Sequence, residues 1–572
     1  MDRSNFLQTL FAPAEKKQLR AIKINPLQQR VVEDNPFTGG INPYAGAWTD
    51  NEVIHLLKRL SFGAPVEDVA YFKTLTLSQA VDALINTTNT AINVGTPPKL
   101  YSPNSSTTLP SDPDWSIPVG STWVNTPTSS GSVNANRRDS LKAWWFNTIV
   151  NQPTCIEEKM IVFWSTHFAI EFDTVGTATF NYNYITTLRQ YCVGNLKAFA
   201  KAITLNPAML IYLNGYLNTK TAPDENYGRE LQELFTQGKG PLSLYTEDDV
   251  KTAARVLTGY QVNNTDVTSY FTASRHDTNP KQFSSYYNNT VINRPIAEGQ
   301  QELDDLINMI YGTNEAALYI CRRLYRFFVY DNITSDTESA VIAPLAATLR
   351  INNYEIKPVL LQLFKSEHFF DVLQNGAMIK SPLDYTIGLI KECKIKMPPK
   401  SNPQLRYRHL SYLGVSFLPT LGQNLGDPPN VSGFPAYYQT PLFDKIWIDT
   451  DTFSRRQSLI NTLISTGYSS GGFKLQIDAV DLAKRMSSPA DPNQLVLDFN
   501  KFLLRRTLSQ ALRDSIKTDI LLTGQASDHY WSDAWDAYIN SPADLNNFSV
   551  VSSRLKNLAL YFLSKLEEYH LM

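Results

Sequence analysis

Few features of this 572-residue chain mark a specialised class of protein. It has only 4 cysteines, and they stand too far apart to form the close pairs of a zinc site or a redox dithiol. Neither sign of charge dominates, because 52 basic side chains face 54 acidic ones. The chain therefore lacks the positive field of a nucleic-acid binder. No apolar run approaches the roughly 18 to 20 residues needed to cross a bilayer. We expect buried thiols, no nucleic-acid partner and no membrane span.

The signatures of several well-known enzyme classes are also missing. The chain contains no His-Glu-x-x-His zinc motif, no Gly-x-Ser-x-Gly nucleophile turn, no phosphate-binding loop and no dinucleotide fingerprint. Zinc peptidases, hydrolase-fold esterases, nucleotide hydrolases and dehydrogenases thus lose their usual support.

The first residues do not form a complete export signal. The stretch from Met1 to Phe11 has a single arginine, and its short apolar part ends before Glu15. The expected localisation is cytoplasmic, with export in complex with a partner as the alternative.

Helical periodicity is what the sequence has in abundance. Residues 138–260 and 301–395 carry successive helical patterns, whereas strand patterns are confined to short stretches such as 260–262. Thr49 opens one helix, and the run 246–249 resembles a capping box that starts another. The sequence predicts a mainly α fold: a large single helical domain with long irregular loops and a C-terminal helical extension.

Changes in composition predict three parts of the chain. Residues 1–46 are polar and interrupted by prolines, as is typical of an N-terminal arm. Residues 47–455 form the main helical domain, with a surface insertion at about 102–140 that is rich in Ser, Thr and Pro. Residues 456–572 form a C-terminal helical region.

The helical pattern at 156–171 carries a candidate histidine. At about 100° per residue, His167 lies on the same helix face as Met160, Phe163 and Trp164. Such a histidine is either a core residue satisfied by one hydrogen bond, or a metal ligand or general base whose dry surroundings adjust its pKa.

The clearest local pattern is a helix at 223–238 that begins near a proline and ends at a glycine. Its polar face groups Asn226, Arg229, Glu230 and Glu233. Carboxylates at i and i+3 can bind one metal ion, or act as acid and base when burial separates their pKa values. The alternative is a solvated face with an Arg229–Glu233 pair, worth a few tenths of a kcal/mol.

Two further segments offer candidate site residues. His276 and Asp277, with Lys281, lie in a polar stretch with no apparent core to serve, which favours function over packing. The alternative is an exposed histidine of no consequence. Residues 427–435 have prolines at both ends, so they suit a fixed pocket wall that presents Asn430, or a purely structural loop.

Several motifs occur in a fixed order along the chain. They are Trp164-x-x-His167-Phe168, residues 206–213, 225–235 and 245–259, His276-Asp277 with Lys281, Lys380-Ser381-Pro382 and residues 428–433. In this order they resemble the large bacterial family catalogued as domain of unknown function 1800, over about residues 50–460. The resemblance implies no established activity. It implies a sulfatase-like partner, because members are often encoded beside one, and joint work on an envelope or extracellular substrate.

Two hypotheses follow for the polar residues. In the first, the protein is an enzyme for metal-assisted or acid/base hydrolysis or oxidation of a polymer, glycan or peptide. Its catalytic residues are then His167, Glu230, Glu233, His276 and Asp277, its divalent metal ligands are His167, Glu230, Glu233 and His276, and its substrate-binding residues are Arg229, Lys281, Asn226 and Asn430. In the second, it is a non-catalytic binding or assembly protein of the cell envelope whose polar cluster is a structural ion network. The oligomeric state is open in both.

Overall fold

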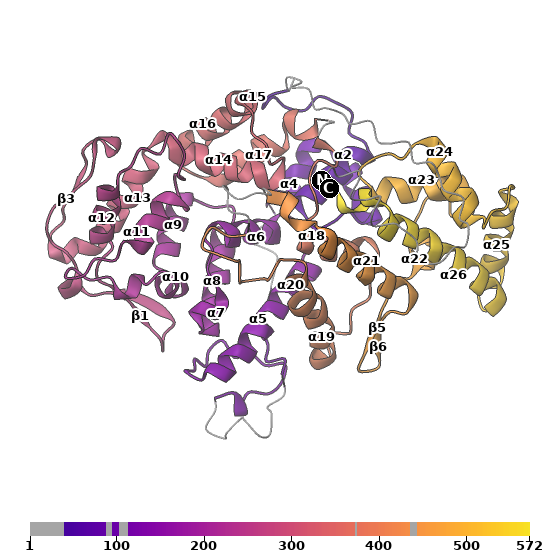
Figure 1. The fold of residues 1–572 in the computed structure, drawn as a ribbon, viewed down its shortest axis with the longest axis horizontal. Coiled ribbons are helices and arrows are strands. Elements are labelled where there is room, and N and C mark those ends of the chain that lie inside the picture. Colours follow the sequence, from indigo (N-terminus) through magenta and orange to yellow (C-terminus); the bar gives the residue numbers. More distant parts are fainter. Residues whose placement is uncertain (1–38, 87–93, 102–112, 372–373, 435–442) are drawn as a thin grey trace. The chain divides into compact units, whose positions relative to one another are not determined.

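Helices make up most of the structure, so the prediction of a mainly α fold is confirmed (Figure 1). The computed structural model describes residues 39–86, 94–101, 113–371, 374–434 and 443–572. Contacts between Cα atoms group residues 39–572 into one unit. Residues 1–38 of the predicted arm and 102–112 of the predicted insertion lie outside the described part. No helix among the described residues is long and apolar enough to cross a membrane.

Helix α2 (Asp50–Leu60), the first in the described residues, begins where the sequence predicts. The backbone N–H of Thr49 donates to Glu52 at 2.9 Å, and the two residues form a capping box at the start of the helix. Residues 39–46 lie against the chain near α17 (Ile356–Phe364), where the N–H of Tyr44 donates to the carbonyl of Lys365 at 2.8 Å. The helices of this part are α2 (Asp50–Leu60), α3 (Val66–Lys73) and α4 (Leu77–Asn86).

Helix α5 (Gly131–Asn151) starts inside the segment predicted as a surface insertion. Trp123, which precedes it, is fully buried, and so is the ion pair between Arg137 and Asp114. The segment is poor in aliphatic side chains, but its tryptophan and this ion pair fill the interior instead. The prediction of a surface loop up to residue 140 is therefore wrong for its second half.

The helices that carry the predicted site residues pack in succession. In Figure 1, α11, α12 and α13 lie side by side, and their contacts confirm this. α6 packs on α8, and α8 packs on α9 and α10. These helices are α6 (Glu157–His167), α7 (Phe172–Val175), α8 (Ala178–Tyr191), α9 (Leu196–Thr204), α10 (Pro207–Tyr212), α11 (Glu225–Glu233) and α12 (Glu247–Val256).

Strands occur only as three short antiparallel pairs in the described residues. The first pair follows α12 directly, at the stretch that the sequence predicts as a strand, with Tyr260 opposite Phe271. The pairs are β1 (Tyr260–Asn263) with β2 (Thr268–Phe271), β3 (Lys281–Gln282) with β4 (Val291–Ile292), and β5 (Tyr468–Ser470) with β6 (Phe473–Leu475).

The remaining helices run from the middle of the chain to its C-terminal part. They are α13 (Glu302–Tyr311), α14 (Asn314–Phe328), α15 (Ser335–Thr337), α16 (Ala343–Ile351), α17 (Ile356–Phe364), α18 (Pro382–Glu392), α19 (Pro403–Leu410), α20 (Leu418–Thr420), α21 (Thr450–Ser465), α22 (Ala479–Lys484), α23 (Pro492–Leu503), α24 (Gln510–Ser515), α25 (His529–Asn540) and α26 (Leu545–Leu560). Short 3-10 and π turns join several of them. Buried apolar side chains from Val53 to Tyr569 form one continuous core cluster. The 4 cysteines are free thiols inside the protein, as predicted.

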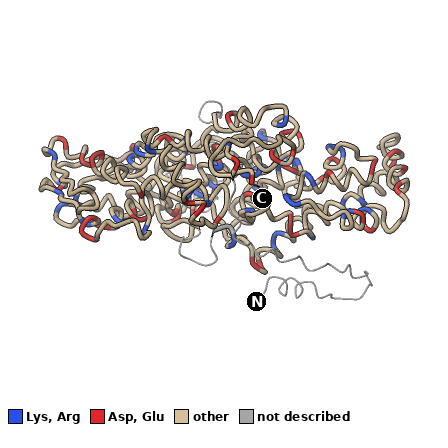
Figure 2. The backbone as a smooth tube through the Cα atoms, turned by 90° about the horizontal axis from the view of Figure 1, so that it is seen from above, with Lys and Arg blue, Asp and Glu red and all other residues tan. Residues whose placement is uncertain are grey.

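Charged residues of both signs alternate along the described chain. Figure 2 shows Lys and Arg interspersed with Asp and Glu over the part of the chain that the structure describes. The absence of a nucleic-acid partner stays a prediction, and this mixture of charges agrees with it.

Candidate functional site

His167 lies at the end of α6 inside a cage of aromatic rings. Its Nε2 donates to the carbonyl of Phe235 at 3.0 Å, while Nδ1 has no hydrogen-bond partner among the described residues. The rings of Phe168 and Tyr319 pack against the imidazole, with centroids 4.6 and 6.1 Å away. Burial, and secondarily the charge of Arg323, lowers the pKa of His167 well below its ordinary value. This is the geometry of a neutral core histidine.

Glu230 and Glu233 lie on α11, and their surroundings differ. Glu233 forms an ion pair with Lys239 at 3.3 Å. Glu230 is half-buried and forms no ion pair among the described residues. Burial, followed by repulsion from Glu233, raises the pKa of Glu230 to about 7. Glu230 is therefore suited to exchange a proton near neutral pH.

Arg229 pairs with carboxylates other than the predicted one. Its Nη2 lies 2.7 Å from Glu247, at the start of α12, and 3.2 Å from Glu225. The expected Arg229–Glu233 pair does not form, because the arginine reaches back toward the first turn and across to the neighbouring helix. Asn226 is exposed, and its Nδ2 donates a long bond of 3.4 Å to the carbonyl of Leu213. These two residues join α11 to its neighbours.

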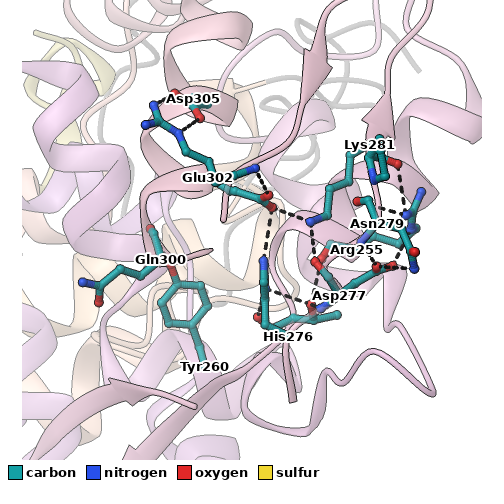
Figure 3. A network of polar contacts seen from close by, with 12 residues as sticks. Arg255, Tyr260, His276, Asp277, Asn279, Lys281, Gln300, Glu302 and Asp305 are labelled. Carbon is teal, nitrogen blue, oxygen red and sulfur yellow. Dashed lines mark hydrogen bonds and ion pairs between the residues drawn. The ribbon is translucent and has the colours of Figure 1, made fainter. Parts of the chain in front are cut away.

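His276 lies in a buried network that its polar sequence surroundings concealed (Figure 3). Its side chain is only 1% exposed, and Lys281 is 0% exposed, so the alternative of an exposed histidine is wrong. The Nδ1 of His276 donates to the carbonyl of Thr258 at 2.9 Å, and its Nε2 lies 3.2 Å from Oε2 of Glu302. Both ring nitrogens thus face oxygen atoms of the protein.

Glu302 is the centre of this network, and the sequence pattern did not single it out. Its Oε2 also lies 2.6 Å from the Nζ of Lys281, and its Oε1 accepts the backbone N–H of Arg294 at 3.1 Å. Burial acts to raise the pKa of Glu302, but the bonds from His276, Lys281 and Arg294 lower it more, so the net shift is downward. Glu302 begins α13, and an acid in the first turn of a helix is common enough to hide its role.

Asp277 extends the same network toward α12. Its Oδ2 accepts from the Nε of Arg255 at 2.6 Å, and its backbone carbonyl accepts from Lys281. Burial acts to raise the pKa of Asp277, but the bonds from Arg255 and Asn279 lower it below its usual range. Positive and negative groups thus alternate through the network, and each has a partner inside the protein.

Asn430 stabilises its own loop. Its Oδ1 accepts the backbone N–H of Ser432 at 2.9 Å, and its carbonyl accepts the N–H of Gly433 at 3.0 Å. Gly433 has a φ of +92°, and a Cβ there would lie 2.2 Å from the carbonyl oxygen of Thr166. The loop therefore packs directly on the end of α6.

The four predicted metal ligands, His167, Glu230, Glu233 and His276, do not come together. Among the described residues, no group of three or more His, Cys, Asp or Glu side chains is arranged to hold a metal ion. The physical reason is that three of these four side chains have other partners. His167 bonds to a backbone carbonyl, His276 lies against Glu302, and Glu233 pairs with a lysine. The expectation of one shared metal site is therefore contradicted.

A pocket lies beside α6. It holds a cavity of about 90 Å³ and is lined by residues from α6, α14, the segments around α18 and α20, and the last residue of the chain. Its apolar walls include Phe62, Phe163, Phe327, Phe434 and Trp447. The rings of Phe434 and Trp447 pack together with centroids 5.7 Å apart. We call this space the α6 pocket.

Polar groups line the α6 pocket as well. Lys159 forms a buried ion pair with Asp384, and its Nζ lies 4.9 Å from the ring centroid of Phe62. Asp384 also accepts from the hydroxyl of Ser381 at 2.8 Å. Arg323 and Arg326 of α14 contribute two further cations. The sequence patterns did not indicate this pocket, because its walls come from positions as far apart as 62 and 572.

These features describe a mainly helical protein with a closed internal ion network and an open, partly cationic pocket. The family model described as protein of unknown function (DUF1800) matches residues 55–546. The chain therefore belongs to that family, and the match extends beyond the range that the motifs cover. No curated protein and no solved structure matches the chain.

Proposed function

We propose that this protein is a binding protein that receives a ligand with an apolar body in the α6 pocket. The observation that carries the proposal is the pocket itself, whose aromatic walls stand open beside a small number of charged groups. Pockets for small organic ligands are concave and mostly apolar, with a few polar groups that fix orientation.

The hydrogen bonds and ion pairs of the predicted polar residues support a binding function rather than catalysis at those positions. His276, Asp277 and Lys281 are closed by internal partners, and a ligand would have to break those bonds to reach them. A structural role for this cluster is what the hypothesis of a non-catalytic binding or assembly protein predicts.

The experiment is to fill the pocket and measure binding of a fluorescent apolar probe. Thr166 lines the pocket, so Thr166→Trp should weaken binding of the neutral dye N-phenylnaphthylamine at least about tenfold, because the new ring occupies the ligand's space. Thr186→Trp is the matched control: both hydroxyls donate to a carbonyl three residues earlier at 2.8 Å, but Thr186 lies on α8, outside the pocket. Equal binding by the two variants would refute the proposal.

Acid/base catalysis at Glu230 is a second candidate function. The observation that favours it is the half-buried carboxyl of Glu230, which has no ion pair among the described residues and whose pKa burial and the nearby Glu233 raise to about 7. In this second candidate function, the protein hydrolyses or oxidises a polymer, glycan or peptide. A carbon-detected NMR titration tests it, since a Glu230 carboxyl that titrates in the ordinary range near 4.5 would remove the candidate.

A sulfatase-like partner protein belongs to this proposal as an inference from the family. Recovery of such a protein with the tagged chain, from cells that express both, would support it. Cytoplasmic localisation, or export in complex with that partner, is tested by fractionation of the same cells.

A further inference from the structure

A second concave surface lies at α21, and hydroxyl groups line it where aromatic and charged groups line the α6 pocket. It is an open groove with a volume of about 410 Å³, compared with about 90 Å³ for the α6 pocket. Its lining comes from two helical segments, which are α21 and the π-helical turn Ser411–Phe417 with the α20 that follows it. We call this surface the α21 groove.

Five of the side chains that line the α21 groove carry a hydroxyl group. They are Ser416 and Thr420 on one segment, and Ser454, Ser458 and Thr462 on α21. On each segment they are four residues apart, a spacing that brings successive side chains to the same side of a helix. The three serines are exposed, and their hydroxyls form no hydrogen bond within the described part of the chain, so they can bond to a ligand.

Helix formation alone does not explain these hydroxyl side chains on α21. Serine and threonine are weaker helix formers than the Lys, Glu and Gln that commonly cover the exposed face of a helix. The buried face of α21 carries Phe453, Ile460 and Leu463, and packing of this apolar face holds the helix in place. The exposed face can therefore carry residues that are chosen for what they bind.

An aromatic ring lies beside the hydroxyl groups. Tyr412 lines the groove, and its ring stacks on that of Tyr468 in β5, with centroids 3.7 Å apart and planes inclined by 3°. Burial, followed by Tyr468, raises the pKa of Tyr412, so its hydroxyl keeps its proton at neutral pH and can donate as well as accept. The stack holds this ring in one position at the groove.

The groove carries little net charge. Among the described residues that line it, Arg455 is the one charged side chain, and its Nε lies 2.7 Å from Oδ2 of Asp451 on the same helix. Asp449 is a second acid near this arginine. An anionic ligand would have to compete with these carboxylates, so the groove suits an uncharged ligand better.

We propose that the α21 groove binds a short neutral oligosaccharide, whose hydroxyl groups bond to the serine and threonine side chains and whose ring packs on Tyr412. This site is separate from the α6 pocket and goes beyond the function proposed for it. A hydroxyl group both donates and accepts, so a row of them complements the hydroxyls of a sugar. The C–H groups on the face of a sugar ring pack against the negative face of an aromatic ring. An apolar helix of a partner protein would leave the hydroxyls without hydrogen bonds, at a cost in free energy.

The experiment is a calorimetric titration of the full chain with cellotetraose, maltotetraose, chitotetraose and xylotetraose. We expect the wild type to bind at least one of these sugars. Ser458→Trp should weaken that binding at least about tenfold, because the new ring occupies the space of the ligand. Ser465→Trp is the matched control and should change binding less than about twofold, since Ser465 is an exposed serine of α21 that does not line the groove.

A second pair of variants tests the aromatic ring. Tyr412→Ala should weaken sugar binding about tenfold, whereas Tyr412→Phe keeps the ring and should weaken it less than about threefold. Tyr530→Ala, at an exposed tyrosine of α25, is the control for loss of a ring elsewhere. Equal binding by Tyr412→Ala and wild type would overturn the role of the ring. Circular dichroism spectra and melting temperatures show whether each variant is folded.

The remaining outcomes separate this inference from its competitors and from the proposed function. A wild type that binds none of the sugars, or a Ser458→Trp variant that binds them like Ser465→Trp, overturns the proposal. Binding of tetragalacturonic acid alone would overturn the neutral class of ligand. A protein that copurifies with Ser465→Trp but not with Ser458→Trp, without any sugar binding, would assign the groove to a protein partner instead. Thr166→Trp fills the α6 pocket and should leave sugar binding unchanged, so either site can fail without the other.

Discussion

The network around Glu302 and the α6 pocket around Arg323 differ in how their charges are balanced. In the network, every cation lies within hydrogen-bonding distance of an oxygen atom supplied by the protein itself. In the pocket, Arg323 has no carboxylate partner among the described residues. A fully buried charge costs several kcal/mol unless it is paired, so the network has to be closed for the chain to fold. A half-exposed guanidinium keeps part of its hydration, so the pocket can remain open to an outside partner.

The largest expected effect comes from disrupting the ion network around Glu302. Glu302→Gln removes the negative charge between Lys281 and His276 and leaves the buried ammonium group of Lys281 without this counter-charge. We expect a loss of about 3 to 5 kcal/mol of unfolding free energy, measured by urea denaturation.

Glu298→Gln is the control for Glu302→Gln. Glu298 pairs with Arg294 at 3.4 Å near the surface, and its removal should cost less than about 1 kcal/mol. If Glu302→Gln were as stable as this control, the network would not have the structural role that we assign to it.

A smaller effect is expected from the loop that forms one side of the pocket. Gly433→Ala should cost about 2 to 3 kcal/mol, because its Cβ would overlap the Thr166 carbonyl and its φ of +92° is strained for alanine. Gly422 has a similar φ of +88° but open space around it, so Gly422→Ala isolates the strain alone. Thermal melts of both variants give the difference, and equal losses would show that the contact with α6 is loose.

The smallest effect concerns Glu230, whose pKa is about 7 in the folded protein and near 4.5 when unfolded. Between these values the folded state binds more protons, so this group lowers stability progressively as the pH rises from 4.5 to 7. Glu230→Gln should therefore stabilise the protein at pH 8 by on the order of 1 kcal/mol after solvent screening, with little change at pH 4. Denaturant curves at the two pH values measure it. Destabilisation at pH 8 would indicate that the carboxylate has a partner.

The local parts of the fold could be predicted from the sequence. Thr246 caps α12 and forms the expected capping box with Asp249, and β1 begins at Tyr260 as its pattern indicates. These features depend on residues within a few positions of each other, so a short window of sequence contains the whole cause. The apolar face that buries His167 was also correctly placed on α6.

The site residues could not be assigned in the same way, because their partners are distant in the sequence. The polar sequence around His276 does not indicate that the carboxylate of Glu302 lies next to this histidine. Nor does α11 indicate that Arg229 pairs with Glu247 rather than with Glu233. The α6 pocket combines residues from Phe62 to Met572, which no periodicity relates. Burial and charge pairing are properties of the assembled fold, and they decide which polar residues remain available.

The apolar core runs without interruption from Val53 in α2 to Tyr569 near the last residues. If one helix of this core were removed, the apolar side chains that its neighbours pack against it would be exposed to water. The helices after residue 455 are thus part of the folding unit on which the pocket is built. Described residues at the two ends of that core are expected to melt together at one temperature, whichever end a thermal probe reports.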